Sequence, residues 1–117
     1  MDRVFTQDVM VPHRERGAPE SVRLIPSSGP ATALSALALG NSVATPAGGV
    51  TAEVIEVNSL TEVEALGREK IAGKTVFFNR PVDPAIVLPG RAYGVAGDRR
   101  RPGPLTAPQF GAVAALT

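Results

Sequence analysis

Few side chains in this sequence could form a catalytic or metal site. His13 is the only histidine, and the chain has no cysteine. A hydrolytic zinc site normally takes three protein ligands from His, Asp and Glu, and one histidine cannot supply the common two-histidine arrangement. His13 stands among charges in the segment His13-Arg14-Glu15-Arg16. We therefore expect it to be a polar loop residue or a contact to another domain.

The acidic residues do not complete a metal site either. Glu53 and Glu56 are explained as the solvated side of a strand. None of the carboxylates has the spacing of a metal-binding loop; those considered are Asp83, Asp98, Glu53, Glu56, Glu62 and Glu64. We predict no metal ligand in this chain.

Two segments match catalytic motifs only in part. Ser42 lies in GNSVATPAGG together with Thr45, but Ala44 takes the place of the second glycine in Gly-x-Ser-x-Gly. Gly73-Lys74-Thr75 is similar to the end of a phosphate-binding loop. That motif needs an earlier glycine, where Arg68 stands, and a helix after it, where we predict a strand. Neither a serine hydrolase nor a nucleotide-binding loop is predicted.

Arginines form the strongest local charge feature, at Arg99-Arg100-Arg101. We expect a solvated loop here, and the alternative is recognition of a carboxylate, which the planar fork of a guanidinium group suits. Asn79, Arg80 and Tyr93 stand at predicted strand ends and loops, where a domain can contact a substrate or a neighbouring domain. The sequence thus predicts no catalytic or cofactor-binding residue.

A strand–helix–strand unit between residues 48 and 81 would position these side chains. Residues 50–57 alternate in hydrophobicity and predict a strand, with a bulge or burial on both faces at Val54-Ile55. Ser59 and Glu62 form a capping box, in which the Glu62 side chain reaches back to the Ser59 amide. It begins a helix over residues 60–66 that Gly67 closes. Residues 75–79 predict a buried strand.

The flanking segments are shorter and richer in proline. Residues 21–25 predict a strand. Residues 33–39 are ambiguous between a helix and a strand, and Pro30 before them with Gly40 after them favours a short helix. Residues 80–90 predict a loop with three prolines, and 104–110 a short helix in which Pro108 moves Ala107 away from α geometry. Gly111 ends that helix, and residues 112–116 form a closing strand.

Length and charge limit the classes of protein. The 117 residues suit one domain and leave no room for a catalytic domain as well. A net charge of +1 gives no field that would recruit nucleic acid. No apolar run approaches the roughly 20 residues that span a bilayer. The first residues lack the pattern of a signal peptide. Because the chain stops on an apolar strand, we expect a part of a larger protein.

An ordered series of segments carries a family resemblance across nearly the whole chain. The segments are VPHRERG (11–17), LALGNSVATPAGGVTAEVIEV (37–57), the capped helix at Ser59, GKTVFFNRP (73–81), Tyr93-Gly94 and GAVAALT (111–117). Together they resemble the protease-associated domain that is inserted into secreted zinc exopeptidases of the carboxypeptidase Q type.

The resemblance implies a fold and a boundary, and it implies a strand over residues 33–39, which we favour over the helix. The expected fold is α+β, mostly β, with a β-sandwich or open-barrel core and short flanking helices. Residues 1–20 would be an extended segment that links to the parent catalytic domain, and residues 21–117 the protease-associated domain.

The resemblance also implies a role without catalysis. The domain would cover or border the active-site cleft of an extracellular or periplasmic zinc exopeptidase and restrict access to short peptides. Zinc would lie in the parent catalytic domain. The implied partners are that domain, a peptide substrate and a second copy of the parent enzyme. Arg100 matches an arginine of the family, so the candidate contact residues are Asn79, Arg80, Tyr93 and Arg100. The alternative is a stand-alone peptide- or protein-binding module with a swivelling, β-rich fold.

Overall fold

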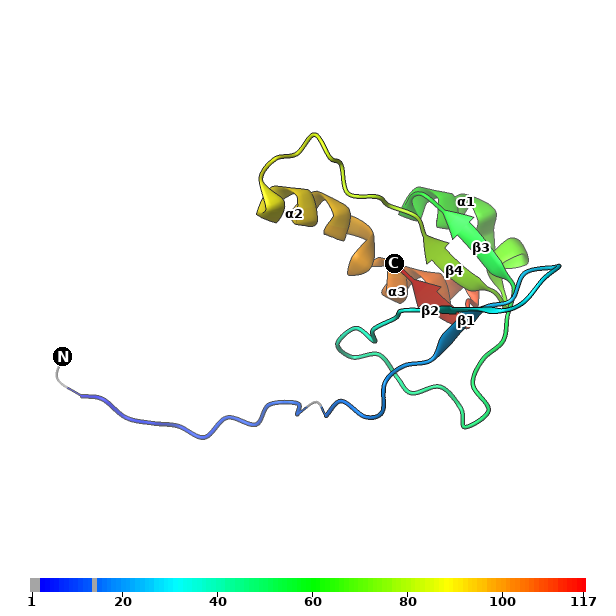
Figure 1. The fold of residues 1–117 in the computed structure, drawn as a ribbon. Helices are drawn as coiled ribbons and strands as arrows, with labels where there is room; N and C mark the ends of the chain where they lie inside the picture. The colour runs from blue at the N-terminus through cyan, green and yellow to red at the C-terminus, as the bar shows by residue number, and fades with distance from the viewer. Residues whose placement is uncertain (1–2, 14) are drawn as a thin grey trace. The chain divides into compact units, whose positions relative to one another are not determined.

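The predicted strand–helix–strand unit is present in a computed structural model that describes residues 3–13 and 15–117, with the backbone alone for residue 98. Strand β3 (Val54–Val57) leads into helix α1 (Leu60–Ile71), which returns the chain to strand β4 (Thr75–Phe78). The two strands pair in parallel, with Val57 opposite Phe78. A parallel pair needs such a crossover connection, and here α1 supplies it (Figure 1).

A second crossover adds strand β5 (Ala114–Leu116) in parallel to β4. It contains helix α2 (Pro89–Arg100), helix α3 (Gly103–Thr106) and a 3-10 turn, η1 (Ala107–Phe110). Among the described residues this sheet has the order β3-β4-β5. The closing strand is thus confirmed in a shorter form than residues 112–116.

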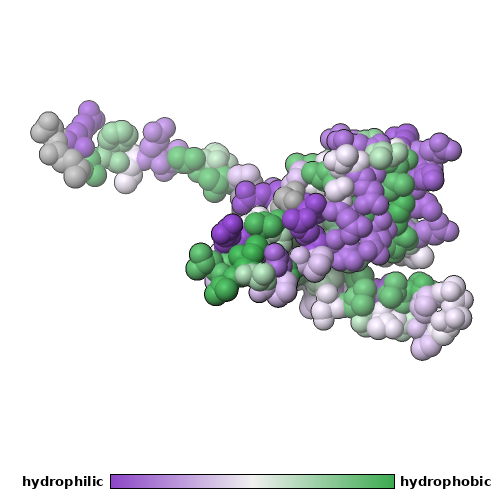
Figure 2. Space-filling model, turned by 90° about the horizontal axis from the view of Figure 1, so that it is seen from above, coloured by the Kyte–Doolittle hydropathy of each residue, from purple (hydrophilic) through white to green (hydrophobic). Residues whose placement is uncertain are grey.

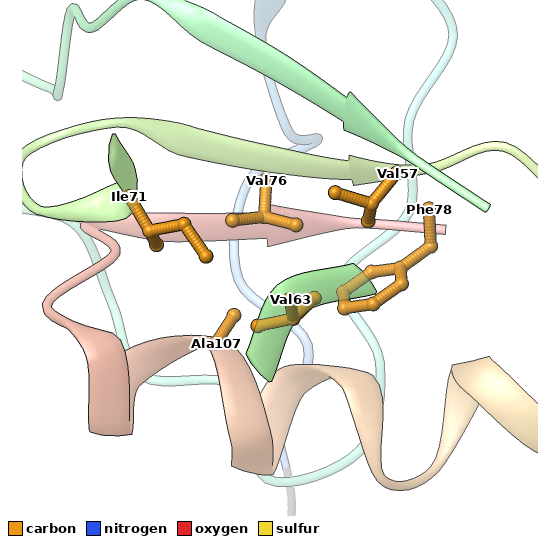
Figure 3. Close-up of a cluster of buried hydrophobic side chains, with 6 residues drawn as sticks. All are labelled: Val57, Val63, Ile71, Val76, Phe78 and Ala107. Carbon is orange, nitrogen blue, oxygen red and sulfur yellow. The ribbon is translucent and has the colours of Figure 1, made fainter. Parts of the chain in front are cut away.

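The hydrophobic core lies on one face of this sheet. Residues that pair in parallel strands point to the same side, so Ile55 and Val76 share a face with Val57 and Phe78. Helix α1 and turn η1 cover that face, and Figure 3 shows the side chains converging between sheet and helices. The buried cluster contains Val57, Val63, Ile71, Val76, Phe78 and Ala107.

Helix α1 begins at the predicted cap and extends beyond its predicted end. The Ser59 hydroxyl accepts from the Glu62 N–H at 3.0 Å, as predicted. The Glu62 carboxylate accepts from the N–H of Asn58 at 2.7 Å, one residue before the amide that we expected. Gly67 leaves helical geometry with a φ of 62°, but the helix resumes and runs to Ile71. The Ile71 side chain is fully buried, and this burial explains why the helix resumes after Gly67.

Strand β3 is shorter than residues 50–57 and buries the opposite set of side chains. The alternation of residues 50, 52 and 54 predicted Val54 on the inner face, but Val54 is exposed and Ile55 and Val57 face the core. The pairing with β4 is continuous across the strand, so the bulge is absent. Val54 and Glu56 are exposed, so the strand is not buried on both faces. Contact with α1 and β4, rather than local alternation, decides which side is buried.

Helix α2 is the element that the sequence did not predict. Residues 80–90 were predicted as loop, and irregular structure indeed follows β4, but the helix begins at Pro89. Tyr93, Arg99 and Arg100 therefore lie on a helix and not in a loop, which corrects the prediction. The glycines at 90, 94 and 97 concealed the helix, because glycine costs about 1 kcal/mol relative to alanine in a helix interior.

The predicted helix over residues 104–110 is present as α3 followed by η1. The prediction that Pro108 moves Ala107 out of α geometry is wrong, because Ala107 has φ and ψ of −54° and −42°. The missing N–H of Pro108 is accommodated where the α-helix changes to a 3-10 turn. Gly111 ends the turn with a φ of 84°, as predicted.

The residues divide into two compact units, Met1–Ala44 and Thr45–Thr117. The first unit contains the antiparallel strands β1 (Val22–Leu24) and β2 (Thr32–Leu34). Residues 35–39 are irregular, so the favoured strand over 33–39 holds only at its start and the helical alternative is wrong. The Glu20 carboxylate accepts from the N–H of Ala38 at 2.8 Å. A boundary at residue 20 stays a prediction.

The fold class is a small α+β arrangement, with two open sheets among the described residues. The expectation of a mostly β fold is wrong, because the helices contain more of these residues than the strands do. Exposed hydrophobic residues occur in both units, and Figure 2 shows hydrophobic and hydrophilic residues interspersed on the face in view. Arg14 of the first motif and the side chain of Asp98 lie outside the described residues. Within the described ranges, no helix is long and apolar enough to span a membrane.

Candidate functional site

An open depression lies where strands β3 and β4 end. Its volume is about 460 Å³. The chain enters it directly from both strands, since Asn58 follows β3 and Asn79 follows β4. Parallel strands bring their carboxyl ends to one edge of a sheet, which is where open α/β sheets bind ligands. The lining residues are Asn58, Asn79, Arg80, Pro81, Val82, Asp83, Pro84, Val95 and Ala96.

Asn79 is held by the end of the sheet. Its N–H donates to the carbonyl of Val57 at 2.9 Å, which extends the β3–β4 ladder by one bond. Its side-chain Nδ2 donates to Oε1 of Glu56 at 2.8 Å. Two bonds to the neighbouring strand therefore fix the residue that precedes Arg80.

The outer wall is a proline-rich loop with its own turn. Oδ1 of Asp83 accepts from the N–H of Ala85 at 2.9 Å, and the Asp83 carbonyl accepts from Ile86 at 3.2 Å. A short aspartate side chain that bonds two residues ahead stabilises such a turn. Pro81 and Pro84 restrict the backbone on either side, because their rings fix φ.

Among the described lining residues, Arg80 is the cation and Asp83 is the carboxylate. Arg80 is exposed, and no other described residue forms an ion pair with it. A guanidinium group in this setting can donate two parallel hydrogen bonds to a carboxylate. The lining residues include no Ser, Thr, Cys, His or Lys, so the depression offers binding groups and no nucleophile with a base.

Tyr93 and Arg100 form a second pair, on helix α2 and not in the depression. The Arg100 guanidinium carbon lies 5.5 Å from the centre of the Tyr93 ring, within the range of a cation–π contact. Both residues are exposed. The predicted contact residues thus separate into Asn79 with Arg80 and Tyr93 with Arg100.

The sequence prediction missed Asn58 and Val95, which line the depression. Asn58 could have been found, because a polar residue directly after a parallel strand lies at the same edge as Asn79. Val95 could not, because α2 was not predicted.

His13 and Ser42, which were considered for chemistry, belong to the first unit. His13 Nε2 lies 3.4 Å from Oε1 of Glu15 in the first unit, and both side chains are exposed. Ser42 is exposed, and its N–H donates to the carbonyl of Leu39 in a turn. Among the described residues, no three His, Cys, Asp or Glu side chains lie close enough together to hold a metal ion.

Lys74 is paired at the start of β4. Its Nζ donates to Oε2 of Glu53 at 2.6 Å. This hydrogen bond, together with the lysine charge, lowers the pKa of the Glu53 carboxyl below its ordinary value. The contact explains Gly73-Lys74-Thr75 as a turn and strand start rather than as a phosphate-binding loop.

Comparison with known proteins finds relatives named carboxypeptidase Q. The chain is 37% identical over 116 residues to carboxypeptidase Q of Xenopus laevis and 34% identical over 116 residues to that of Rattus norvegicus. These alignments cover 99% of the chain and 22% of the relatives, so the chain spans about a fifth of their length. Human carboxypeptidase Q is 37% identical over 81 residues, which are 69% of the chain and 16% of that protein. No family model matches the chain, and no solved structure matches it.

Proposed function

We propose that the chain is a non-catalytic, protease-associated domain of a zinc-dependent exopeptidase, in which it borders the active-site cleft. The observation that carries the proposal is the identity of 34% to 37% with carboxypeptidase Q along 116 residues. Identity spread along the whole chain supports a shared domain rather than a shared short motif. Zinc in the remainder of the protein and export from the cytoplasm follow from the family resemblance.

The proposal that the chain has no catalytic role rests on the side chains that it offers as metal ligands. The sequence has one histidine and no cysteine, so a zinc site within it would need mostly carboxylate ligands, which suit harder cations. The charged depression has one guanidinium and one carboxylate on a proline-rich loop. Such groups bind and orient a peptide terminus, whereas the bond-breaking groups would come from the rest of the protein.

The sheet geometry supports a position beside the cleft. Strand β5 runs parallel to β4, with Leu116 opposite Phe77. Any residues that follow Thr117 would leave from the sheet edge where Asn79 and Arg80 lie. The depression would then face the segment that continues from this domain.

The proposal is tested with zinc and peptides. The full-length protein should hydrolyse short peptides and lose this activity on chelation, while the 117-residue chain should neither bind zinc by calorimetry nor hydrolyse peptides. Tight zinc binding by the chain, or peptidase activity that survives its repurification, would contradict the proposal. A full-length protein that binds peptides without cleaving them would favour the stand-alone binding module.

A further inference from the structure

Helix α2 has too little internal support for its length. It has twelve residues, and no side chain provides a cap hydrogen bond at its start. Of its described side chains only Ala92 is buried, at 7% exposure. Isolated helices of this length are marginal in water, and most helical stability in proteins comes from packing of one face.

The amino-acid composition of α2 lowers its stability further. Three glycines stand inside the helix, at 90, 94 and 97. A Cβ at any of them would meet nothing within 4 Å, so no close packing among the described residues explains the glycines. Glycine in a helix interior is less favourable than alanine, because it loses more backbone freedom on folding. In Figure 1, α2 extends away from the three-stranded sheet and connects to it through α3.

The exposed surface of this segment is both apolar and basic. Leu88 is 66% exposed, Tyr93 59% and Val95 41%. Residues 88–101 contain four arginines and one aspartate. Apolar side chains next to arginine and tyrosine are typical of the central residues of protein interfaces.

We propose that α2 is a docking helix, and that its partner is an acidic surface of the same full-length protein outside residues 1–117. This inference rests on the proposed function. The relatives are several times longer than the chain, which covers 22% of them, so they contain material for such a surface. The excess of arginine favours a partner surface of opposite charge. Docking would bury the apolar side chains and supply the packing that α2 lacks.

The test is hydrogen exchange of backbone amides in the 117-residue chain and in the full-length protein. In the chain alone, amides of residues 88–101 should exchange quickly while those of residues 60–78 are protected. In the full-length protein, exchange of residues 88–101 should slow on the order of tenfold or more. Arg100→Glu should remove this gain and leave residues 60–78 protected, whereas Arg68→Glu, an exposed arginine of α1, should retain the gain.

Two results would overturn the docking helix. One is strong protection of residues 88–101 in the chain alone, because the helix would then need no partner. The other is rapid exchange of these residues in the full-length protein. If that protein cleaves peptides while α2 stays unprotected, only the docking inference fails. If α2 becomes protected in a protein that cleaves no peptide, the docking inference stands and the proposed peptidase function fails.

Discussion

At the scale of single residues, the two adjacent phenylalanines of β4 have different roles. Phe78 is 2% exposed and belongs to the core, while Phe77 is partly exposed on the opposite face of the sheet. Truncation of a buried phenylalanine to alanine costs about 3 to 5 kcal/mol, a large share of the roughly 5 to 15 kcal/mol that stabilises a domain. In urea denaturation of the 117-residue chain, the Phe78→Ala variant should be largely unfolded. The Phe77→Ala variant should lose less of the free energy of unfolding. Equal stability of the two variants would contradict this orientation of β4.

The ion pair between Lys74 and Glu53 gives a prediction about how the stability of the chain depends on pH. Because the hydrogen bond from Lys74 lowers the folded-state pKa of Glu53, the pair contributes stability above the ordinary pKa of a glutamate. That contribution is lost as the pH falls through the lowered value. In carbon NMR titration, Lys74→Met should raise the pKa of the Glu53 carboxyl, and high salt should move it in the same direction. An unchanged titration of Glu53 in the variant would show that the contact is absent in solution.

At the scale of elements, glycines separate positions that are packed from positions that are open. A Cβ at Gly103 of α3 would lie 2.8 Å from Cε2 of the Phe78 ring, which is buried and cannot move away freely. Gly103→Ala should therefore destabilise the chain by about 1 to 3 kcal/mol. Gly97→Ala in α2 meets open space and should instead raise helix content, because alanine is the better helix former. Thermal melts and circular dichroism measure both effects, and a destabilising Gly97→Ala would show that α2 is already packed.

How much of each element could be predicted depends on whether its signal is local. The cap at Ser59, the buried run at residues 75–78 and the glycine that ends η1 are encoded by neighbouring residues, and the structure confirms them. The face of β3 that is buried depends on contacts with other elements, so the alternation of its own residues did not predict it. The continuation of α1 past Gly67 also depends on such contacts, so the glycine alone did not predict where the helix ends. Helix α2 has weak local propensity and was missed. Two of the four predicted contact residues, Asn79 and Arg80, line the depression, because polar residues after parallel strands gather at one edge.

At the scale of the whole molecule, the parallel sheet and its helices form a scaffold that presents one charged edge. The buried cluster holds β3, β4, α1 and η1 together, and the proline-rich loop after β4 carries Arg80 beside two asparagines. In the proposed enzyme, this edge would bind the end of a peptide while the remainder of the protein cleaves it. Under this proposal, Arg80 would contribute to catalysis by binding substrate and would contribute little to folding.

The most direct test of this account is the kcat/KM of the full-length protein for short peptides after Arg80→Ala, with Arg68→Ala as the matched control. Both arginines are exposed, and Arg68 lies near the end of α1 beyond the kink at Gly67. Loss of a charge-assisted hydrogen bond costs roughly 1.5 to 3 kcal/mol, so Arg80→Ala should lower kcat/KM on the order of tenfold to a hundredfold with an unchanged melting temperature, and Arg68→Ala should leave the kinetics unaltered. Equal kcat/KM for both variants and the parent protein would contradict a role of this edge in substrate binding.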